Sequence, residues 1–263
     1  MRKIENSPII AYHKIGVKFD WSGTWTTLAQ FDLQMRYLHS QGYTTCALVE
    51  AVRGYRPGRV ALTFDDAYES VYLHAFRIMK RYGFTGTIFV ITGYAGRSNV
   101  WDVNLGGRRW DHMTWEQIKE MREWGFEFGS HTHMHPDLTC SAPDVIRREL
   151  GISKEILEER LAAPCRYLSY PFGRANARVK AAAREAGYEA AFGITPARDG
   201  DPMEIGRLGV YVIDLLFDFK AKLGQSGRFM SRLEAGKGRV INFFSHGTTL
   251  VKNPSRFKPG SAI

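Results

Sequence analysis

The chain has 263 residues, of which 44% are hydrophobic, and both values suit one large α/β domain. Its formal net charge is +9, but the basic residues are spread along the chain and form no nucleic-acid-binding motif, so nucleic acid is not an expected partner. The positive charge instead favours an anionic substrate or a peripheral contact with a membrane surface.

Cysteine usage and the N-terminus exclude several other classes. Cys46, Cys140 and Cys165 are an odd number without CxxC spacing, so neither a disulfide framework nor a zinc knuckle is expected. The first residues lack the apolar core of a signal peptide. No run of about 18 apolar residues is present to span a bilayer. These patterns together predict a cytoplasmic protein without a transmembrane segment.

Strand-like and helix-like segments alternate along most of the chain, which is the pattern of repeated βα units. The first helix shows the signal clearly, because Leu28, Phe31, Met35 and Leu38 recur on one face before Gly42. In chain order we predict a strand at Ile9–His13, a helix at Thr26–Gln41, a strand at Val60–Phe64, a helix at Tyr68–Tyr82, a strand at Thr87–Thr92, a helix at Thr114–Trp124, a strand at Phe126–Ser130, a helix at Ala142–Leu161, a strand at Tyr167–Tyr170, a helix at Ala175–Ala186, and strands at Ala190–Ile194 and Leu208–Ile213.

The last part of the chain differs in character. Leu215–Leu223 is a short basic amphipathic stretch, and Val240–Phe244 is a candidate eighth strand after a glycine-rich break. We therefore predict a catalytic domain at residues 1–225 and a C-terminal extension at 226–263. A long glycine-containing loop, Gly93–Met113, carries His112, and we expect this side chain to face a substrate.

Four apolar runs end at residues that suit an active site. In a parallel barrel the carboxyl ends of the strands meet at one face, so side chains that follow different strands converge there. The residues at these four ends are Asp65-Asp66, His131, Pro171-Phe172-Gly173 and His13.

His131 and His135 have the spacing of two ligands for one metal ion. Residues i and i+4 share a face of a helical turn, so both imidazoles can reach one cation, whereas His133 points elsewhere. Of two adjacent carboxylates, Asp65 and Asp66, one can bind the metal while the other accepts a proton from an activated water. The pattern predicts metal-assisted hydrolysis.

Three motifs resemble those of the polysaccharide deacetylases, the NodB-homology group of carbohydrate esterases. They are Thr63-Phe-Asp-Asp66, Ser130-His-Thr-His-Met-His-Pro136 and Ser169-Tyr-Pro-Phe-Gly173, and the resemblance covers about residues 8 to 215. It implies a distorted (β/α) barrel of about seven strands and a divalent metal, most commonly zinc, with cobalt, nickel or manganese as alternatives. By resemblance, Asp66, His131 and His135 are the metal ligands, Asp65 is the general base, and the backbone N–H of Phe172 binds the oxyanion.

Two departures from the family pattern concern the first and third motifs. Ala67 stands where the first motif usually continues with glycine, and Ser169 stands where the third motif usually has an arginine that tethers the base. Arg207, in Ile205-Gly-Arg-Leu-Gly209, is our candidate substitute, with an ordinary surface arginine as the alternative.

The general acid has two candidates. His13 and His246 each follow an apolar run, and amide cleavage needs a proton for the leaving amine. A circularly permuted branch, similar to the enzymes that deacetylate poly-N-acetylglucosamine, places this histidine near the N-terminus. We therefore favour His13, because a Gly- and Arg-rich break precedes the segment before His246.

The resemblance implies a metal-dependent hydrolase that removes an N-acetyl group from an amino sugar. The charge and the expected location favour a phosphate-bearing or lipid-linked glycan precursor over a long polymer. Two alternatives stay open at this point: a glycan-binding module without turnover, which only the missing tethering arginine supports, and an amidohydrolase of a non-sugar amide.

Overall fold

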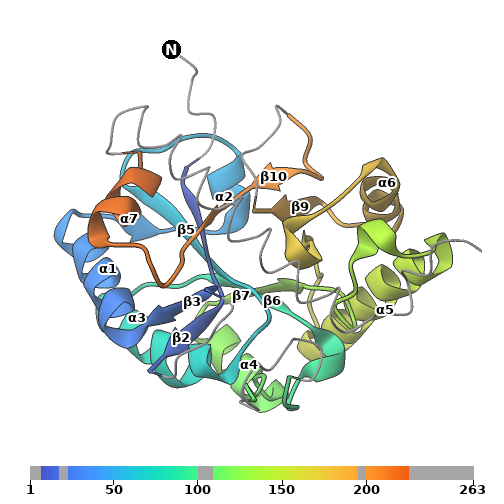
Figure 1. Cartoon of the computed structure of the whole chain (residues 1–263), viewed down its shortest axis with the longest axis horizontal. Helices are drawn as coiled ribbons and strands as arrows, with labels where there is room; N and C mark the ends of the chain where they lie inside the picture. Colours follow the sequence, from blue (N-terminus) through green and yellow to red (C-terminus); the bar gives the residue numbers. More distant parts are fainter. Residues whose placement is uncertain (1–6, 18–22, 100–108, 195–199, 225–263) are drawn as a thin grey trace, which may run out of the picture.

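The computed structural model describes residues 7–17, 23–99, 109–194 and 200–224. Its main sheet is parallel, in the order β10-β9-β8-β7-β6-β5-β1-β11, with β4 paired to β5 (Figure 1). The strands are β1 (Ile9–Tyr12), β4 (Thr44–Thr45), β5 (Arg59–Phe64), β6 (Thr87–Val90), β7 (Glu127–Ser130), β8 (Tyr167–Ser169), β9 (Ala190–Gly193), β10 (Ile205–Gly206) and β11 (Leu208–Gly209).

One short segment curls the sheet into a nearly closed barrel. The strands β10 and β11 lie at opposite ends of the sheet order, yet Arg207 alone separates them along the chain. Within this five-residue segment, Ile205–Gly206 pairs with β9 and Leu208–Gly209 pairs with β1. The expected distorted (β/α) barrel is confirmed, with the short strands β4 and β10 in addition to the seven expected.

Helices surround the strands, as Figure 1 shows. Turn chemistry fixes several of their ends: Thr27 and Thr114 form capping boxes at the starts of α1 and α4, and Gly83 ends α3 with a φ of 67°. The helices are α1 (Leu28–Ser40), α2 (Leu48–Val52), the π-helix η1 (Val71–Phe76), α3 (Arg77–Tyr82), α4 (Trp115–Glu123), α5 (Pro143–Leu161), α6 (Ala177–Glu185) and α7 (Leu216–Lys222).

Side chains alternate between two buried layers along each strand. On β5, Leu62 packs in the large cluster that the helices cover, whereas Ala61 belongs to a smaller cluster with Phe89 and Phe192. Thr63 and Asp65 follow Ala61 at intervals of two residues. The strand period therefore places both polar side chains on the same face as the smaller cluster, inside the barrel.

Two differences from the sequence prediction concern segments next to the site. A two-stranded parallel sheet, β2 (Lys14–Gly16) with β3 (Trp25–Thr27), follows β1 and is held by buried Ile15 and Trp25. The helix expected from Tyr68 begins one residue later, at Glu69, because Tyr68 forms a bridge to His112, and it continues as a π-helix from Val71.

The predicted strand Val240–Phe244 and the predicted extension at 226–263 lie outside the described residues. Among the helices that are described, none has the combined length and apolar character needed to cross a bilayer.

Candidate metal and catalytic site

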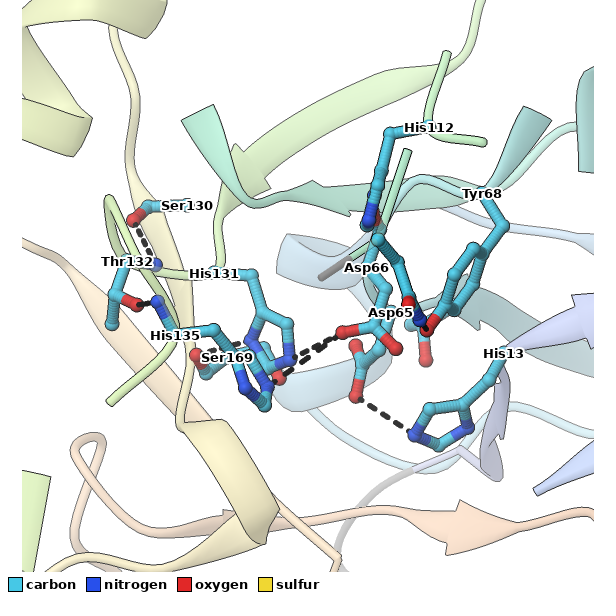
Figure 2. A network of polar contacts seen from close by, with 12 residues as sticks. His13, Asp65, Asp66, Tyr68, His112, Ser130, His131, Thr132, His135 and Ser169 are labelled. Carbon is cyan, nitrogen blue, oxygen red and sulfur yellow. Dashed lines mark hydrogen bonds and ion pairs between the residues drawn. The ribbon is translucent and has the colours of Figure 1, made fainter. Parts of the chain in front are cut away.

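The polar residues that follow four strands meet at one mouth of the barrel (Figure 2). His13 follows β1, Asp65 and Asp66 follow β5, His131 follows β7, and Ser169 ends β8. Parallel strands present their carboxyl ends at the same face, which explains why residues so distant in the sequence are neighbours. All but His13 are at most 3% exposed, so the site is largely shielded from solvent.

Asp66, His131 and His135 form a cluster that can hold a metal ion. The Nε2 atoms of His131 and His135 lie 3.3 Å and 3.7 Å from Asp66 Oδ1, and the three donor atoms are all within 4.8 Å of one another. Ligands placed about 2.1 Å from a tetrahedral zinc are about 3.4 Å apart. The two distances from Asp66 are close to this value, so the three side chains can share one metal ion.

The hydrogen bonds around this cluster also fit a cation. His131 Nδ1 donates to the backbone oxygen of Ser169 at 2.7 Å, so the proton is on Nδ1 and the Nε2 lone pair faces Asp66. In the described part of the chain, Asp66 Oδ1 is buried and accepts no hydrogen bond. A buried carboxylate oxygen in this state is costly unless a positive charge binds it.

The turn that joins the two histidines is not helical, so the predicted geometry of this pair is wrong. Thr132 and His135 have left-handed φ values of 66° and 56°. The Ser130 hydroxyl accepts from Thr132 N at 3.0 Å, and the Thr132 hydroxyl accepts from His135 N at 3.0 Å. These bonds bring the two imidazoles to a centroid distance of 4.8 Å, while His133 turns away toward Thr92, as predicted.

Arg207 and Asp65 form a buried bidentate ion pair beside the cluster. Arg207 Nη1 and Nη2 donate to Asp65 Oδ1 and Oδ2 at 2.8 Å and 2.7 Å. Arg207 is 2% exposed, which rules out the alternative of a surface arginine. The fork geometry fixes the orientation of the carboxylate as well as its charge.

Every nitrogen of the Arg207 guanidinium has a partner. Nη1 also donates to the Thr63 hydroxyl at 3.1 Å, Nη2 to the Ser169 hydroxyl at 2.8 Å, and Nε to the Gly193 oxygen at 3.3 Å. Ser169 thus holds the arginine through its hydroxyl and His131 through its carbonyl. From the sequence, Ser169 was notable only because the family motif usually has an arginine at this position. A single serine at the end of a strand does not indicate that it will contact Arg207 or His131.

The two aspartates are both held in the ionised form. Burial raises the pKa of Asp65, but the Arg207 guanidinium outweighs burial and the net pKa is below the ordinary value. Burial also raises the pKa of Asp66, but the close contact with His131 outweighs burial, and the net pKa is again below the ordinary value. Both carboxylates are therefore anionic at neutral pH, one free to bind a cation and one paired with arginine.

The pKa values of the two histidines of the cluster shift in opposite directions. Burial lowers the pKa of His135 to about 3, which leaves its imidazole neutral. Burial also lowers the pKa of His131, but the charges of Asp65 and Asp66 outweigh it and the net pKa is raised. The negative charge that favours a proton at this position also favours a metal cation.

His13 lies beside Asp65, on the side away from the metal cluster (Figure 2). Its Nε2 is 4.0 Å from Asp65 Oδ2, and its side chain is 14% exposed, so the ring adjoins the base candidate and is partly open to solvent. Burial lowers the pKa of His13, although Asp65 and Asp66 oppose this. The other acid candidate, His246, lies outside the described residues.

Phe172 adjoins the cluster from the turn after β8. Its backbone is left-handed, with a φ of 59°, and its ring packs against the His135 ring at a centroid distance of 4.8 Å. Gly173 follows with a φ of 65°, where a Cβ would stand 2.8 Å from Ile194 N. The turn is therefore tightly packed, and the role of the Phe172 N–H stays a prediction.

Replacing Arg207 with methionine is expected to lower the free energy of unfolding by about 3–5 kcal/mol at pH 7, because a buried carboxylate loses its partner. Arg207→Lys keeps the charge and should lose less. The folded-state pKa of Asp65 is depressed, so the stabilisation is present above the unfolded pKa of about 3.9 and is lost as pH falls further. Urea unfolding at several pH values checks this, and equal losses at pH 7 and pH 3 would contradict it.

Comparison with known sequences supports this assignment of the fold and motifs. A family model described as polysaccharide deacetylase matches residues 53–191. The putative polysaccharide deacetylase YxkH of Bacillus subtilis (strain 168) is 31% identical over 188 residues, covering 69% of this chain and 62% of that protein. The poly-beta-1,6-N-acetyl-D-glucosamine N-deacetylase of Staphylococcus aureus (strain MRSA252) is 29% identical over 162 residues, covering 56% of this chain and 53% of that protein.

Solved deacetylase structures match a larger share of the chain than the curated sequences do. The Streptococcus pyogenes deacetylase PplD, in complex with acetate, matches with a TM-score of 0.72 and 26% identity, covering 83% of this chain and 98% of that one. IcaB from Ammonifex degensii matches with a TM-score of 0.69 and 25% identity, covering 84% and 97%. The chain spans little more than half the length of the curated relatives, yet nearly the whole of these two structures. With its motifs, barrel and family match in agreement, the chain belongs to the polysaccharide deacetylase family.

Proposed function

We propose that this protein is a metal-dependent hydrolase that removes N-acetyl groups from an amino sugar in a polysaccharide or a glycan precursor. The single observation that carries the proposal is the arrangement at the barrel mouth. A cluster of one carboxylate and two imidazoles lies beside a second carboxylate that Arg207 holds in place. A lone metal-binding site would not need the second, oriented carboxylate.

The residues divide the work of amide hydrolysis. Asp66, His131 and His135 would hold a divalent cation, zinc before cobalt, nickel or manganese, which supplies Lewis acidity and lowers the pKa of a water. Asp65, kept ionised by Arg207, accepts the proton of the attacking water.

The later steps need a proton donor and an anion-binding group. His13 borders Asp65 and, in its protonated form, delivers a proton to the leaving amine. The backbone N–H of Phe172 donates to the oxyanion that develops on the acetyl carbonyl. Water added across the amide bond yields acetate and a free amino group.

The alternative of a glycan-binding module loses its support. That alternative rested on the missing arginine of the third motif, and Arg207 donates to both oxygens of Asp65 from another strand end. The proposed substrate class follows the curated relative from Staphylococcus aureus, whose name specifies a poly-beta-1,6-N-acetyl-D-glucosamine. A phosphate-bearing or lipid-linked precursor stays a second arm of the proposal, in keeping with the net charge of +9.

Acetate release tests the proposal directly. Metal-loaded protein should release acetate from β-1,6-linked N-acetylglucosamine oligomers, and a chelator should abolish the release until zinc or cobalt is restored. The panel also includes a UDP-linked N-acetylated sugar, a lipid-linked one and a non-sugar N-acetyl amide. At equal zinc concentration, the melting temperature should rise more in the wild type than in Asp66→Asn, because a ligand that binds only the folded state stabilises it in proportion to its affinity. Release that persists in chelator, or that is confined to the non-sugar amide, would refute the proposal.

A further inference from the structure

The turn that follows β5 holds two consecutive residues in an unfavourable conformation. Asp66 and Ala67 have φ values of 69° and 52°, in the left-handed region that a Cβ disfavours. The φ and ψ angles of Asp66 determine where its carboxylate points. A turn of this kind persists only where surrounding contacts hold it.

A segment from the long loop after β6 supplies those contacts. Asp111, His112 and Met113 run antiparallel to the turn, with a bridge between His112 and Tyr68. Two backbone hydrogen bonds flank this bridge, both at 2.8 Å: Glu69 N donates to Asp111 O, and Met113 N donates to Ala67 O.

The third contact of this segment comes from a side chain and reaches the candidate metal ligand itself. His112 Nδ1 lies 2.6 Å from the backbone oxygen of Asp66. A carbonyl oxygen only accepts, so Nδ1 carries the proton and donates. The His112 ring is 2% exposed and stacks on the Tyr68 ring, with centroids 4.8 Å apart and planes 21° apart, which fixes its orientation.

The expectation that His112 faces a substrate is replaced by a different role. Figure 2 shows the His112 ring approaching Asp66 on the side away from His131 and His135. We propose that His112 is a positioning residue, whose Nδ1–H bond to the Asp66 carbonyl holds the left-handed turn that aims the Asp66 carboxylate at the two imidazoles. This rests on the proposed function only in taking Asp66 as a metal ligand.

A matched pair of variants separates the hydrogen bond from the packing. His112→Asn places an amide nitrogen close to the position of Nδ1, whereas His112→Leu has nearly the same size and no donor. Both variants lose the stacked imidazole. Zinc dissociation constants, measured on metal-free protein by competition with a chromophoric chelator, should rise about 10–100-fold in His112→Leu and stay within about threefold of wild type in His112→Asn.

Stability is measured on the same proteins, because a folding defect alone would lower both properties together. Urea unfolding without metal should show similar losses for the two variants, while only the leucine variant loses zinc affinity. His112→Ala is a second donorless variant should His112→Leu fail to fold. Equal zinc affinity in the asparagine and donorless variants would overturn the proposal, whether affinity is kept or lost in both.

The measurement needs no substrate, so it is independent of the proposed reaction. If wild-type protein binds zinc at this cluster but releases no acetate, the proposed function fails and the comparison of variants still decides the role of His112. If wild-type protein binds no zinc at the cluster, both proposals are overturned. With active protein, restored turnover in metal-saturated His112→Leu would further support a role through metal binding.

Discussion

Asp65→Asn is expected to lower the turnover number for amide hydrolysis by about 10²–10⁴-fold, the usual contribution of a general base. Asparagine has the same shape and can still accept a hydrogen bond from Arg207, but it cannot take the proton of the attacking water. The metal content should stay at the wild-type level, because the donor atoms of the cluster belong to Asp66, His131 and His135.

The neighbouring residue provides the matched control for this experiment. Asp66→Asn makes the same chemical change one position along the chain, but it should weaken metal binding, since Asp66 Oδ1 lies within 3.7 Å of both imidazole nitrogens. Excess zinc should therefore restore part of the activity in Asp66→Asn and none in Asp65→Asn. If Asp65→Asn loses metal instead, or if it keeps wild-type turnover, the assignment of the two carboxylates is wrong.

Most of the main strands could be predicted because they are short, largely apolar runs with little exposure on either face. The run before Asp65 illustrates this, since five of the six residues of β5 are buried. The closing of the barrel could not be predicted in this way. It depends on β10 and β11, which have two residues each and show no period in the sequence.

The convergence of the site was predictable, but its local geometry was not. Side chains at the carboxyl ends of parallel strands share one face, so the meeting of Asp66 with His131 follows from the topology alone. The way His135 reaches the same point depends on left-handed residues such as Thr132, for which the sequence gives no signal. A β-branched residue with positive φ is rare, and hydrogen bonds within the turn select it.

Arg207 shows how a partial prediction can be completed by the fold. The sequence showed that Ser169 occupies the usual position of the arginine, and Arg207 was our candidate substitute. Nothing in the sequence distinguished a buried Arg207 from one on the surface. The structure places Arg207 between two strands that close the barrel, so its side chain enters the interior beside both Asp65 and Ser169. An arginine from a different strand can thus make the contact with Asp65 that the third motif usually supplies.

His13→Ala is expected to lower turnover on N-acetyl sugars by about 10²–10⁴-fold while the metal content stays unchanged. The imidazole is not part of the metal cluster, and its Nε2 lies 4.0 Å from Asp65 Oδ2, so its removal leaves the three metal ligands in place. An amine is a poor leaving group unless it is protonated, so the loss of a positioned acid should affect kcat more than KM.

The leaving group distinguishes an acid from every other role of His13. Nitrophenolate departs without protonation, so His13→Ala should keep most of its activity on p-nitrophenyl acetate, whereas Asp65→Asn should lose activity on the ester and the amide alike. His246→Ala, the comparison variant for the competing acid, should change neither activity strongly. If His246→Ala shows the selective loss on amides and His13→Ala does not, the proton comes from His246. His13 would then act on Asp65 only through its charge.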